Sequence, residues 1–324
     1  MNKLIGVAIW GYSSHVKRRY LPAIKKNKRL NLVGILSRKR SNVSDIDISS
    51  KITIWEDSKQ MLDSPLVDIV IIATPIGLHA SQCIETIKAG KHVLCEKPLT
   101  CNLEDTKKIL EMANNNALIV GEGFMYLYHP MFNAVRKFVN SVSAKSSMSC
   151  NIKFGIPKLE QPGFRNYQDL CGGAFWDVGS YIFSAIIELF GLLNLKIDSF
   201  SLIKEPKAEV DNAGIAILSN ESKNLRIYAE WSINSSYRNE IDIWTDQGSI
   251  FADRFFSKPE NYDAEISYCD IFGSKRTFIL GKDEQFSLML DNFLTMLTDD
   301  EKSLNEQRRI IQTAQLMNDV LNVK

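Results

Sequence analysis

The sequence predicts two domains: an α/β domain with a doubly wound parallel sheet, then an α+β domain with an open, mostly antiparallel sheet. The chain has 324 residues, 45% of them hydrophobic, and single cores rarely grow beyond about 250–300 residues. Up to residue 122, short apolar runs alternate with helix-like stretches, as in a parallel sheet. From Ser146 onward, apolar and polar residues alternate, as in antiparallel strands with one covered face. We therefore expect domains at 1–122 and 123–324.

The composition excludes several classes of protein. No apolar run reaches the roughly 18 residues of a membrane span, and the N-terminus lacks a leader with a cleavage site. The six cysteines form no Cys-x-x-Cys pair, and the four histidines show no metal-ligand spacing. We expect a cytoplasmic protein with reduced thiols, no metal site and no membrane partner.

The net charge of +1 hides an asymmetry, because residues 1–44 carry eleven Lys and Arg and no acid. A basic first lobe favours a phosphate-bearing ligand. Nucleic acid is the alternative partner, but apolar runs interrupt these charges, which lack the interleaved aromatics of a stacking surface. We expect no nucleic acid. For the cations between residues 25 and 29, a solvated helix end is the simpler interpretation.

The first element is an apolar run, Leu4 to Trp10, followed by a turn and a helix over about 17–27. A Rossmann fold binds the pyrophosphate of a dinucleotide at such a strand-turn-helix. The fingerprint G-x-G-x-x-G/A is eroded here, because Ser13 stands in the second glycine position and Val16 in the third. We expect this turn to bind the cofactor phosphates through Gly11, Tyr12, Ser13, Ser14 and His15.

A second buried strand over 30–36 runs into Ser37-Arg38-Lys39-Arg40. Enzymes that select NAD usually place an acid at this strand end, where it binds the ribose hydroxyls. A hydroxyl and a guanidinium would instead hold a 2′-phosphate. We expect Ser37 and Arg38 to select NADP(H) over NAD(H); ordinary loop cations are the alternative interpretation.

Strands over 51–55, 67–73, 92–95 and 117–120 complete the first sheet, with helices up to residue 90 and over about 103–116. The carboxyl ends of parallel strands share one edge, where ligands bind. Thr74-Pro75 and Glu96-Lys97-Pro98 follow two of these ends. Because a residue before proline is held extended, Lys97 is our candidate for the chemical centre. A surface lysine in a turn is the alternative.

Four motifs within about the first 190 residues point to a known family. They are Ala73-Thr74-Pro75-x-x-x-His79-Ala80, the run from Ala89 to Leu99, Gly123-Phe124-Met125-Tyr126-x-x-His129-Pro130, and Gly172-Gly173-Ala174-Phe175-Trp176-Asp177-Val178-Gly179-x-Tyr181. Together they are highly specific. The sequence resembles the glucose-fructose oxidoreductase, inositol dehydrogenase and rhizopine catabolism protein family (Gfo/Idh/MocA).

The resemblance implies roles for several residues. Thr74, Pro75, His79, Glu96 and Lys97 fall on motifs that bind the cofactor, and the Lys97-Pro98 bond is expected to be cis. Asp177 matches the active-site aspartate of the family. Tyr181 falls where many members carry histidine, which resembles the subgroup of glucose-fructose oxidoreductase, dihydrodiol and xylose dehydrogenases, and nucleotide-sugar 3-ketoreductases. Ser184 and Leu127 depart from the aspartate and arginine of other members.

Asp177 and Tyr181 are four residues apart in an expected helix over about 176–190, so they share one helix face. We expect both to bind the substrate, together with Tyr126 and Arg165. The alternative is structural: Asp177 is then a helix-start acid, and Tyr181 and Tyr126 are packing residues.

In the second sheet, apolar positions alternate with polar ones from Leu225 to Ile233. Further strands are expected over 212–219, 240–246, 249–253, 264–269 and 273–279. The open face of this sheet favours a homo-oligomer, since exposed Trp and Ile patches seldom remain bare. Two helices near 284–298 and 304–321 are expected to be structural and able to pack back on the first domain.

These observations predict an NAD(P)-dependent oxidoreductase that acts on a carbohydrate, first of all an NADPH-dependent reductase of a keto-sugar that is free or nucleotide-linked. We expect Tyr181 to donate the proton, Lys97 to lower the pKa of Tyr181 and bind the substrate oxygen, and Asp177 to orient a neighbouring hydroxyl. An NADP-dependent aldose or trans-dihydrodiol dehydrogenase is the alternative enzyme. A cofactor-binding regulator without turnover is the alternative of another class.

Overall fold

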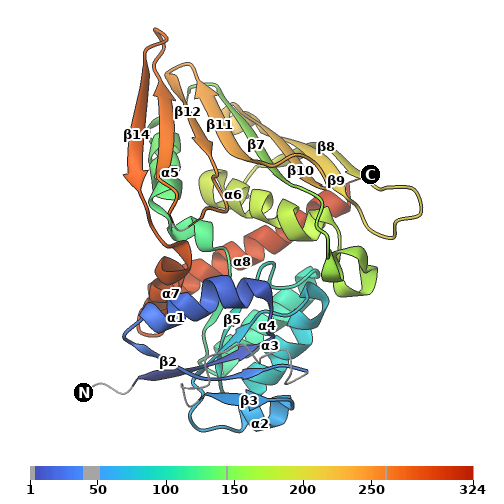
Figure 1. Cartoon of the computed structure of the whole chain (residues 1–324). Helices are drawn as coiled ribbons and strands as arrows, with labels where there is room; N and C mark the ends of the chain where they lie inside the picture. Colours follow the sequence, from blue (N-terminus) through green and yellow to red (C-terminus); the bar gives the residue numbers. More distant parts are fainter. Residues whose placement is uncertain (1–3, 39–51, 144, 260, 324) are drawn as a thin grey trace. The chain divides into compact units, whose positions relative to one another are not determined.

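The computed structural model describes residues 4–38, 52–143, 145–259 and 261–323. The chain forms two units, which we call the first and second unit (Figure 1). The first unit comprises Met1–Gly123 and Phe286–Ile311, and the second comprises Phe124–Gln285 and Gln312–Lys324. The first unit is therefore discontinuous in sequence. The predicted division of labour, with cofactor binding before residue 123 and substrate binding after it, stays a prediction.

The first unit contains a parallel sheet in the order β3-β2-β1-β4-β5-β6. This confirms the predicted doubly wound sheet, whose strand order reverses between β1 and β4. The β4 strand is buried at every position, as expected of a strand covered on both faces. The strands are β1 (Ile5–Trp10), β2 (Leu30–Leu36), β3 (Thr53–Trp55), β4 (Ile69–Ile72), β5 (His92–Cys95) and β6 (Val120–Glu122).

The helices of the first unit pack against this sheet over an apolar core that includes Met61, Cys83, Ile109 and Ile310. Asn102 begins α4 by accepting hydrogen bonds from the N–H groups of its first turn. The helical segments are η1 (Val16–Tyr20), α1 (Leu21–Lys26), α2 (Ser58–Leu62), η3 (Ile76–Leu78), α3 (His79–Lys88), α4 (Leu103–Asn115), α7 (Gln285–Met296) and the part of α8 (Asp300–Leu321) up to Ile311.

The second unit contains the predicted open sheet, in the order β14-β13-β12-β11-β7-β10-β9-β8. All pairs are antiparallel except β7 with β10. The strands are β7 (Met148–Ile156), β8 (Lys196–Ile203), β9 (Ala213–Asn220), β10 (Leu225–Ile233), β11 (Arg238–Thr245), β12 (Gly248–Asp253), β13 (Ala264–Cys269) and β14 (Lys275–Gly281). The helical segments are η4 (Met125–Tyr128), α5 (Pro130–Ser141), η5 (Gly163–Asn166), η6 (Gln168–Leu170), η7 (Phe175–Gly179), α6 (Ser180–Phe190) and η8 (Glu221–Lys223).

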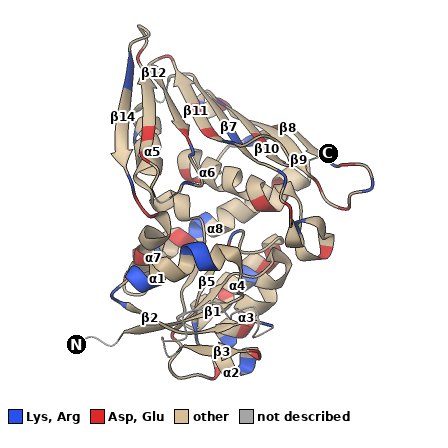
Figure 2. Ribbon diagram, in the orientation of Figure 1, with Lys and Arg blue, Asp and Glu red and all other residues tan. Residues whose placement is uncertain are grey.

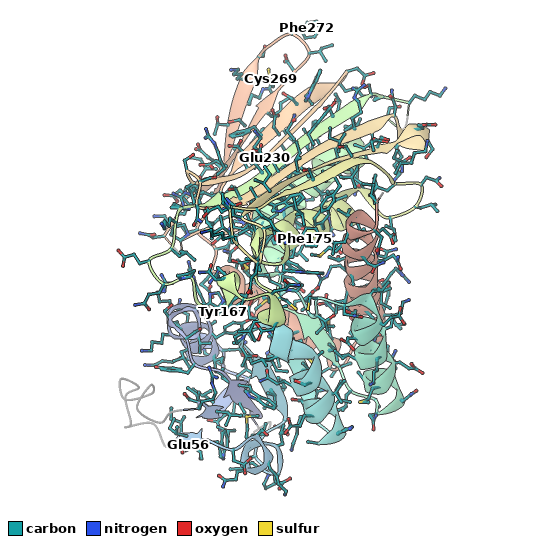
Figure 3. The ribbon with its side chains drawn as sticks, turned by 90° about the vertical axis from the view of Figure 1, so that its right-hand side faces the viewer. Glu56, Tyr167, Phe175, Glu230, Cys269 and Phe272 are labelled. Carbon is teal, nitrogen blue, oxygen red and sulfur yellow. The ribbon has the colours of Figure 1, made fainter. Side chains whose placement is uncertain are left out.

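One face of the second sheet is covered. Trp231 of β10 is fully buried and packs against the rings of Phe175, Phe183 and Phe200. A side chain at Gly214 would collide with the Trp231 ring, at 2.4 Å, so the neighbouring strand needs glycine there. Figure 3 shows Phe175 inside this unit. This cluster anchors η7 and α6, which carry the predicted site residues Asp177 and Tyr181, against the sheet.

The other face of the sheet is open and partly apolar. Tyr228 on β10, Ile215 on β9, Trp244 on β11 and Phe251 on β12 are 40%, 42%, 54% and 39% exposed. We call these four residues the open-face patch. The strand register places Tyr228 and Phe251 in one row across the sheet, through Asn151 and Asp242. Glu230, labelled in Figure 3, lies on the same face and forms an ion pair with Lys153 at 3.1 Å.

Three expectations from composition can be compared with the structure. Cys83, Cys95, Cys150 and Cys269 are free thiols, as expected, whereas Cys101 and Cys171 are disulfide-bonded, so the expectation of reduced thiols is wrong for these two. Over the described residues, no group of three or more His, Cys, Asp or Glu could hold a metal ion. The stretch Gln168–Phe190 has the length and apolar composition of a membrane span, but its apolar 18-residue part is 83% buried inside the protein, as in a core helix.

Candidate functional site

The glycine turn joins three strand ends of the first unit. The N–H of Gly11 donates to the carbonyl of Leu36 at 3.0 Å. Gly11 has a φ of +105°, and a Cβ there would lie 2.8 Å from the carbonyl oxygen of Ala73, so only glycine fits. A helical turn begins at Ser14, and its first N–H groups have no acceptor within the helix. Ser13 Oγ accepts from the N–H of Val16 at 3.3 Å. A pyrophosphate fits this turn despite the eroded fingerprint.

The end of β2 fits a 2′-phosphate. Ser37 is buried, and its N–H donates to the carbonyl of Trp55 at 3.0 Å. Arg38 is exposed. Neither residue is acidic, so the described end of β2 offers no carboxylate to repel the phosphate. Lys39 and Arg40 lie outside the described residues. Further cations lie on η1 and α1 (Figure 2), including Lys17, which sits 4.9 Å from the ring centroid of Tyr12.

His79 lies inside the first unit and ties two turns together. Its ring is fully buried, with Nδ1 2.9 Å from the carbonyl oxygen of Pro98 and Nε2 3.0 Å from that of Thr74. Burial lowers the pKa of His79, although both carbonyls oppose the shift. Thr74 itself donates to Gln82 at 2.5 Å. The contacts of His79 therefore support the Thr74-Pro75 turn, and its predicted cofactor role stays a prediction.

Glu96 is bound to the glycine turn. Its Oε1 accepts from the hydroxyl of Tyr20 at 2.7 Å and lies 3.1 Å from Nε2 of His15. Burial alone would raise the pKa of Glu96, but His15, the Tyr20 hydroxyl and Lys97 outweigh it and lower the pKa to about 2. The ring of Phe286 packs edge-on against both His15 and Tyr20. Glu96 is thus an ionised carboxylate that joins the end of β5 to the glycine turn.

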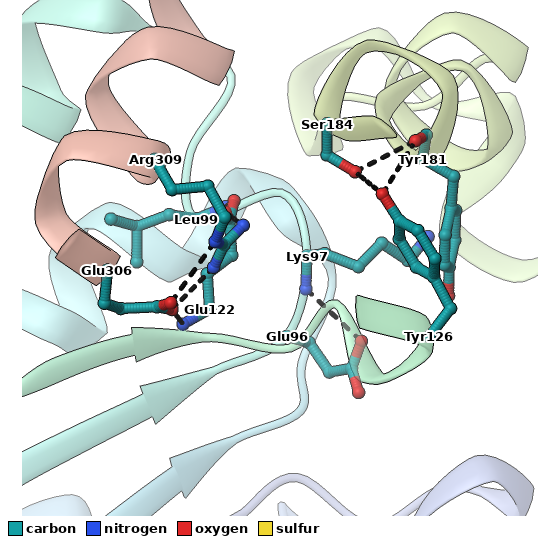
Figure 4. A network of polar contacts seen from close by, with 9 residues as sticks. All are labelled: Glu96, Lys97, Leu99, Glu122, Tyr126, Tyr181, Ser184, Glu306 and Arg309. Carbon is teal, nitrogen blue, oxygen red and sulfur yellow. Dashed lines mark hydrogen bonds and ion pairs between the residues drawn. The ribbon is translucent and has the colours of Figure 1, made fainter. Parts of the chain in front are cut away.

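Lys97 follows β5 in a turn whose backbone is held by side chains (Figure 4). The Lys97-Pro98 peptide bond is cis, which confirms the prediction. The N–H of Lys97 donates to Glu96 Oε2 at 3.3 Å, and the N–H of Leu99 donates to Glu122 Oε1 at 2.7 Å. Lys97 thus belongs to the same strand-end edge as Gly11 and Thr74, as predicted from the alternation of strands and helices.

Sequence reasoning missed a buried ionic network behind this turn (Figure 4). Arg309 Nη1 donates to Glu122 Oε2 at 3.0 Å, and Arg309 Nη2 donates to Glu306 Oε1 at 2.5 Å. Burial raises the pKa of Glu122, and Arg309 and the N–H of Leu99 partly offset this. A signal was available, because Glu306 and Arg309 lie on the buried stripe of α8 with Ile310 and Thr313.

In the second unit, Arg165 and Asp177 are in contact. Nε of Arg165 donates to Asp177 Oδ2 at 2.5 Å, and Asp177 is 6% exposed in the first turn of η7. The carbonyl of Arg165 accepts from the N–H of Gly173 at 2.9 Å. A Cβ at Gly172 would lie 2.5 Å from that carbonyl oxygen. The two predicted glycines therefore allow the Arg165 turn to close on the start of η7.

Asp211 is a second acid at this helix start, which sequence reasoning also missed. Its Oδ2 accepts from the N–H of Phe175 at 2.8 Å, and its carbonyl accepts from the N–H of Ala174 at 3.0 Å. Burial raises the pKa of Asp211 to about 6, against the opposing effect of the Phe175 N–H. Asp211 stands 34 positions beyond Asp177 in the sequence, and no local pattern marks it as a partner of that helix.

Tyr181 is the second residue of α6, which directly follows the π-helical turn η7. It is 7% exposed, and its hydroxyl lies 3.6 Å from the sulfur of Met125. The hydroxyl of Tyr126 lies 2.6 Å from Ser184 Oγ, and Ser184 donates to the carbonyl of Tyr181 at 2.9 Å (Figure 4). Tyr126 is fully buried. Its contacts support the helix of Tyr181, and its predicted substrate contact stays a prediction.

Comparison with known proteins agrees with this picture. A family model described as "Oxidoreductase family, NAD-binding Rossmann fold", that of Gfo/Idh/MocA, matches residues 5–124. A dTDP-3,4-didehydro-2,6-dideoxy-α-D-glucose 3-reductase of Saccharopolyspora spinosa is 28% identical over 266 residues, which cover 82% of this chain and 80% of the relative. A D-xylose 1-dehydrogenase (NADP(+)) of Haloferax volcanii is 31% identical over 167 residues, 51% of each chain.

Among solved structures, the 3-ketoreductase KijD10 of Actinomadura kijaniata, in complex with NADP and TDP-benzene, superposes with a TM-score of 0.91 at 24% identity. The match covers 98% of this chain and 97% of the ketoreductase, so both share one fold. Residues 5–124, which carry the glycine turn and the Glu96-Lys97-Pro98 turn, therefore match the NAD-binding Rossmann domain of the Gfo/Idh/MocA oxidoreductases.

Proposed function

We propose that the protein reduces a keto-sugar with NADPH, and that the sugar is linked to a nucleotide. The observation that carries this proposal is the Lys97 turn, a lysine held at the ligand-binding edge of a dinucleotide-binding sheet. The relatives support the substrate class, because a dTDP-sugar 3-reductase matches over most of the chain.

The selection of NADP(H) rests on Ser37 and Arg38. The expected preference is tested by titrating NADPH and NADH into the protein and into Arg38→Ala. We expect the variant to lose roughly tenfold or more in NADPH affinity, since a charge-assisted contact to a phosphate contributes about 1.5–3 kcal/mol. NADH affinity should stay unchanged. Tighter binding of NADH than of NADPH by the wild type would contradict the selection.

When bound, NADPH supplies the hydride. The protein must then stabilise the alkoxide that develops on the substrate oxygen and supply its proton. We assign proton donation to the hydroxyl of Tyr181 and charge stabilisation to the ammonium group of Lys97. Asp177, held by Arg165, orients a hydroxyl of the substrate next to the carbonyl. Glu96 and the glycine turn hold the dinucleotide, and Tyr126 buttresses the helix of Tyr181 through Ser184.

The proposed activity is tested by following absorbance at 340 nm. The panel contains dTDP-3,4-didehydro-2,6-dideoxy-α-D-glucose, the substrate named for the relative, with NADPH, and xylose, glucose and a trans-dihydrodiol with NADP⁺. We expect turnover of the nucleotide keto-sugar and a loss of two orders or more in kcat/KM for Lys97→Ala. Lys107→Ala is the matched control, because Lys107 lies on the exposed side of α4, paired with Glu104.

Each outcome has a clear meaning. Turnover of the free aldoses or the dihydrodiol alone would favour the dehydrogenase alternative, which the xylose dehydrogenase relative supports. Cofactor binding without turnover on the whole panel would favour the non-catalytic regulator. Near-normal turnover by Lys97→Ala would remove Lys97 from the mechanism.

We also propose that a second copy of the chain covers the open-face patch. Four large apolar side chains on one sheet face form a surface of the kind that oligomers bury. Analytical ultracentrifugation should give a dimer or tetramer, and Trp244→Lys should shift it to smaller species. A monomeric wild type would contradict this. Cytoplasmic location stays a prediction.

A further inference from the structure

The backbone around Lys97 leaves the sheet one residue before the lysine. The N–H of Glu96 still bonds to the carbonyl of Ile72, at 2.8 Å, in the manner of the sheet. The next backbone groups bond to side chains instead. The Glu96 carboxylate accepts from the N–H of Lys97, and the ring of His79 donates to the carbonyl of Pro98. The geometry of the turn therefore depends on side chains from elsewhere in the first unit.

Glu122 holds the far end of this turn. It is 3% exposed, at the last position of β6. Its two carboxylate oxygens have separate partners. Oε1 accepts from the N–H of Leu99 at 2.7 Å, two residues beyond Lys97, and Oε2 accepts from Arg309 at 3.0 Å. One carboxylate thus connects the lysine turn to the C-terminal helix α8.

Arg309 is in turn fixed by Glu306, one turn earlier in α8. The guanidinium donates to both oxygens of Glu306, at 2.5 Å and 3.2 Å. Glu306 also accepts from the N–H of Glu122 at 3.0 Å. Figure 4 shows these contacts converging behind the turn. The three side chains thus close a ring of hydrogen bonds in which β6 and α8 fix one another.

Stability alone is a poor explanation of such a network. Burying three charged groups costs desolvation, and apolar residues of similar size often fill the same space equally well. What the charged groups add is a defined orientation, because a hydrogen bond between them is strong only over a narrow range of angles. The oriented carboxylate of Glu122 fixes the position of the Leu99 N–H, and with it the backbone of the turn that carries Lys97.

We propose that Glu122, oriented by Arg309, is a positioning residue that sets Lys97 for the reaction. This inference rests on the proposed function, in which Lys97 acts on the substrate. Glu122 touches neither substrate nor cofactor in this proposal. It acts through the Leu99 N–H, and its removal leaves Lys97 present but badly placed.

The test is a double-mutant cycle with Glu122→Gln and Lys97→Ala, measured at 340 nm on dTDP-3,4-didehydro-2,6-dideoxy-α-D-glucose. The amide of Glu122→Gln has one acceptor oxygen, so it cannot reproduce both contacts of the carboxylate. In the wild-type background we expect kcat to fall roughly 10- to 100-fold, as for a misplaced catalytic group, with KM and the Kd for NADPH little changed. In the Lys97→Ala background we expect no further loss.

The outcomes separate this inference from the proposed function. A further loss of the same size in the Lys97→Ala background shows a general structural role and overturns the inference, while the role of Lys97 stands. Normal turnover by Lys97→Ala overturns the proposed function instead. Asp68→Asn is the control, because Asp68 also accepts from a backbone N–H, that of Gly6 at 2.7 Å, next to the amino end of β4.

A second readout needs no turnover. Reductive methylation with ¹³C-formaldehyde gives each lysine an NMR signal, and the Lys97 signal is assigned from its loss in Lys97→Ala. We expect Glu122→Gln to shift or split the Lys97 signal and to leave that of Lys107 unchanged. An unchanged Lys97 signal overturns the inference. Should Glu122→Gln fail to fold, Arg309→Lys tests the same link, since lysine keeps the charge but loses the two-pronged geometry.

Discussion

Arg165 holds Asp177 twice over, with Nε 2.5 Å from the carboxylate and with a carbonyl that accepts from the N–H of Gly173, four residues before Asp177. One residue thus fixes both the acid and the backbone that carries it. The predicted substrate residues Arg165 and Asp177 therefore behave as a single unit, and they should be tested as one.

Arg165→Ala should raise KM for the keto-sugar and lower kcat/KM by roughly 10- to 100-fold, because a charge-assisted hydrogen bond contributes about 1.5–3 kcal/mol. Arg165→Lys should recover little, since an ammonium group cannot reproduce the contact from Nε. Asp177→Asn should add almost no further loss in the Arg165→Ala background. Steady-state kinetics of the four proteins provide the measurement, and independent losses that add would contradict the coupling.

Tyr126→Phe and Tyr181→Phe form a matched pair, since each removes one hydroxyl from the same aromatic cluster. Tyr126→Phe should lower the free energy of unfolding by about 1 kcal/mol through the lost contact to Ser184, with nearly normal turnover. Tyr181→Phe should do the reverse, with an unfolding free energy near that of the wild type and at least a hundredfold loss of kcat. Urea unfolding and the 340 nm assay measure both. Loss of turnover in Tyr126→Phe with normal stability would instead place Tyr126 on the substrate.

Asp211 should make the protein less stable as the pH rises. Its pKa in the folded chain is about 6, above the usual value of 3.8, so the folded state binds the proton more tightly than the unfolded state. This stabilisation is complete below pH 4 and is lost between about pH 4 and 6. Asp211→Asn keeps an acceptor for the Phe175 N–H and lacks the ionisation. Relative to the wild type it should gain up to about 3 kcal/mol between pH 4 and 7, as measured by urea unfolding. Parallel pH profiles would contradict this.

Lys258 should instead make the protein more stable as the pH rises. Burial lowers its pKa to about 7, and its ammonium group donates to the carbonyl of Phe255 at 2.7 Å. The unfolded state therefore holds the proton up to a higher pH than the folded state, so stability from this group rises above pH 7. Between pH 7 and 9 the wild type should gain about 2–3 kcal/mol over Lys258→Met. Lys153→Met, on the exposed face of the sheet, should show no such difference.

The sequence predicted those parts of the fold that depend on neighbouring residues. The strands over 30–36 and 92–95 were predicted to the residue, because each is an apolar run between polar turns. The last strand was predicted at 117–120 but lies at Val120–Glu122. Ala117 has a left-handed φ of +53°, which delays the strand. From the sequence alone, Glu122 looks like a turn residue. Its burial is explained only by its contact with Arg309, which lies far along the chain.

The site residues likewise divide into those that local motifs identified and those that depend on contacts distant in the sequence. Motifs identified Gly11, Lys97, Asp177 and Tyr181 because each stands in a local pattern. The residues that orient them were not identified, since Asp211 and Arg309 contact their partners only after the chain has folded and the stripe of α8 gives Arg309 no partner by itself. Asp211 and Arg309 matter because they are buried beside the site, and sequence patterns predict the burial of a charged residue poorly.

The discontinuity of the first unit has a consequence for how the protein is made. A ribosome completes the six strands of the first sheet early, yet Glu306 and Arg309 emerge only after all of Phe124–Gln285. Until then the carboxylate of Glu122 has no guanidinium beside it. During synthesis the first unit can therefore complete its lysine turn only after the whole of Phe124–Gln285 has been made.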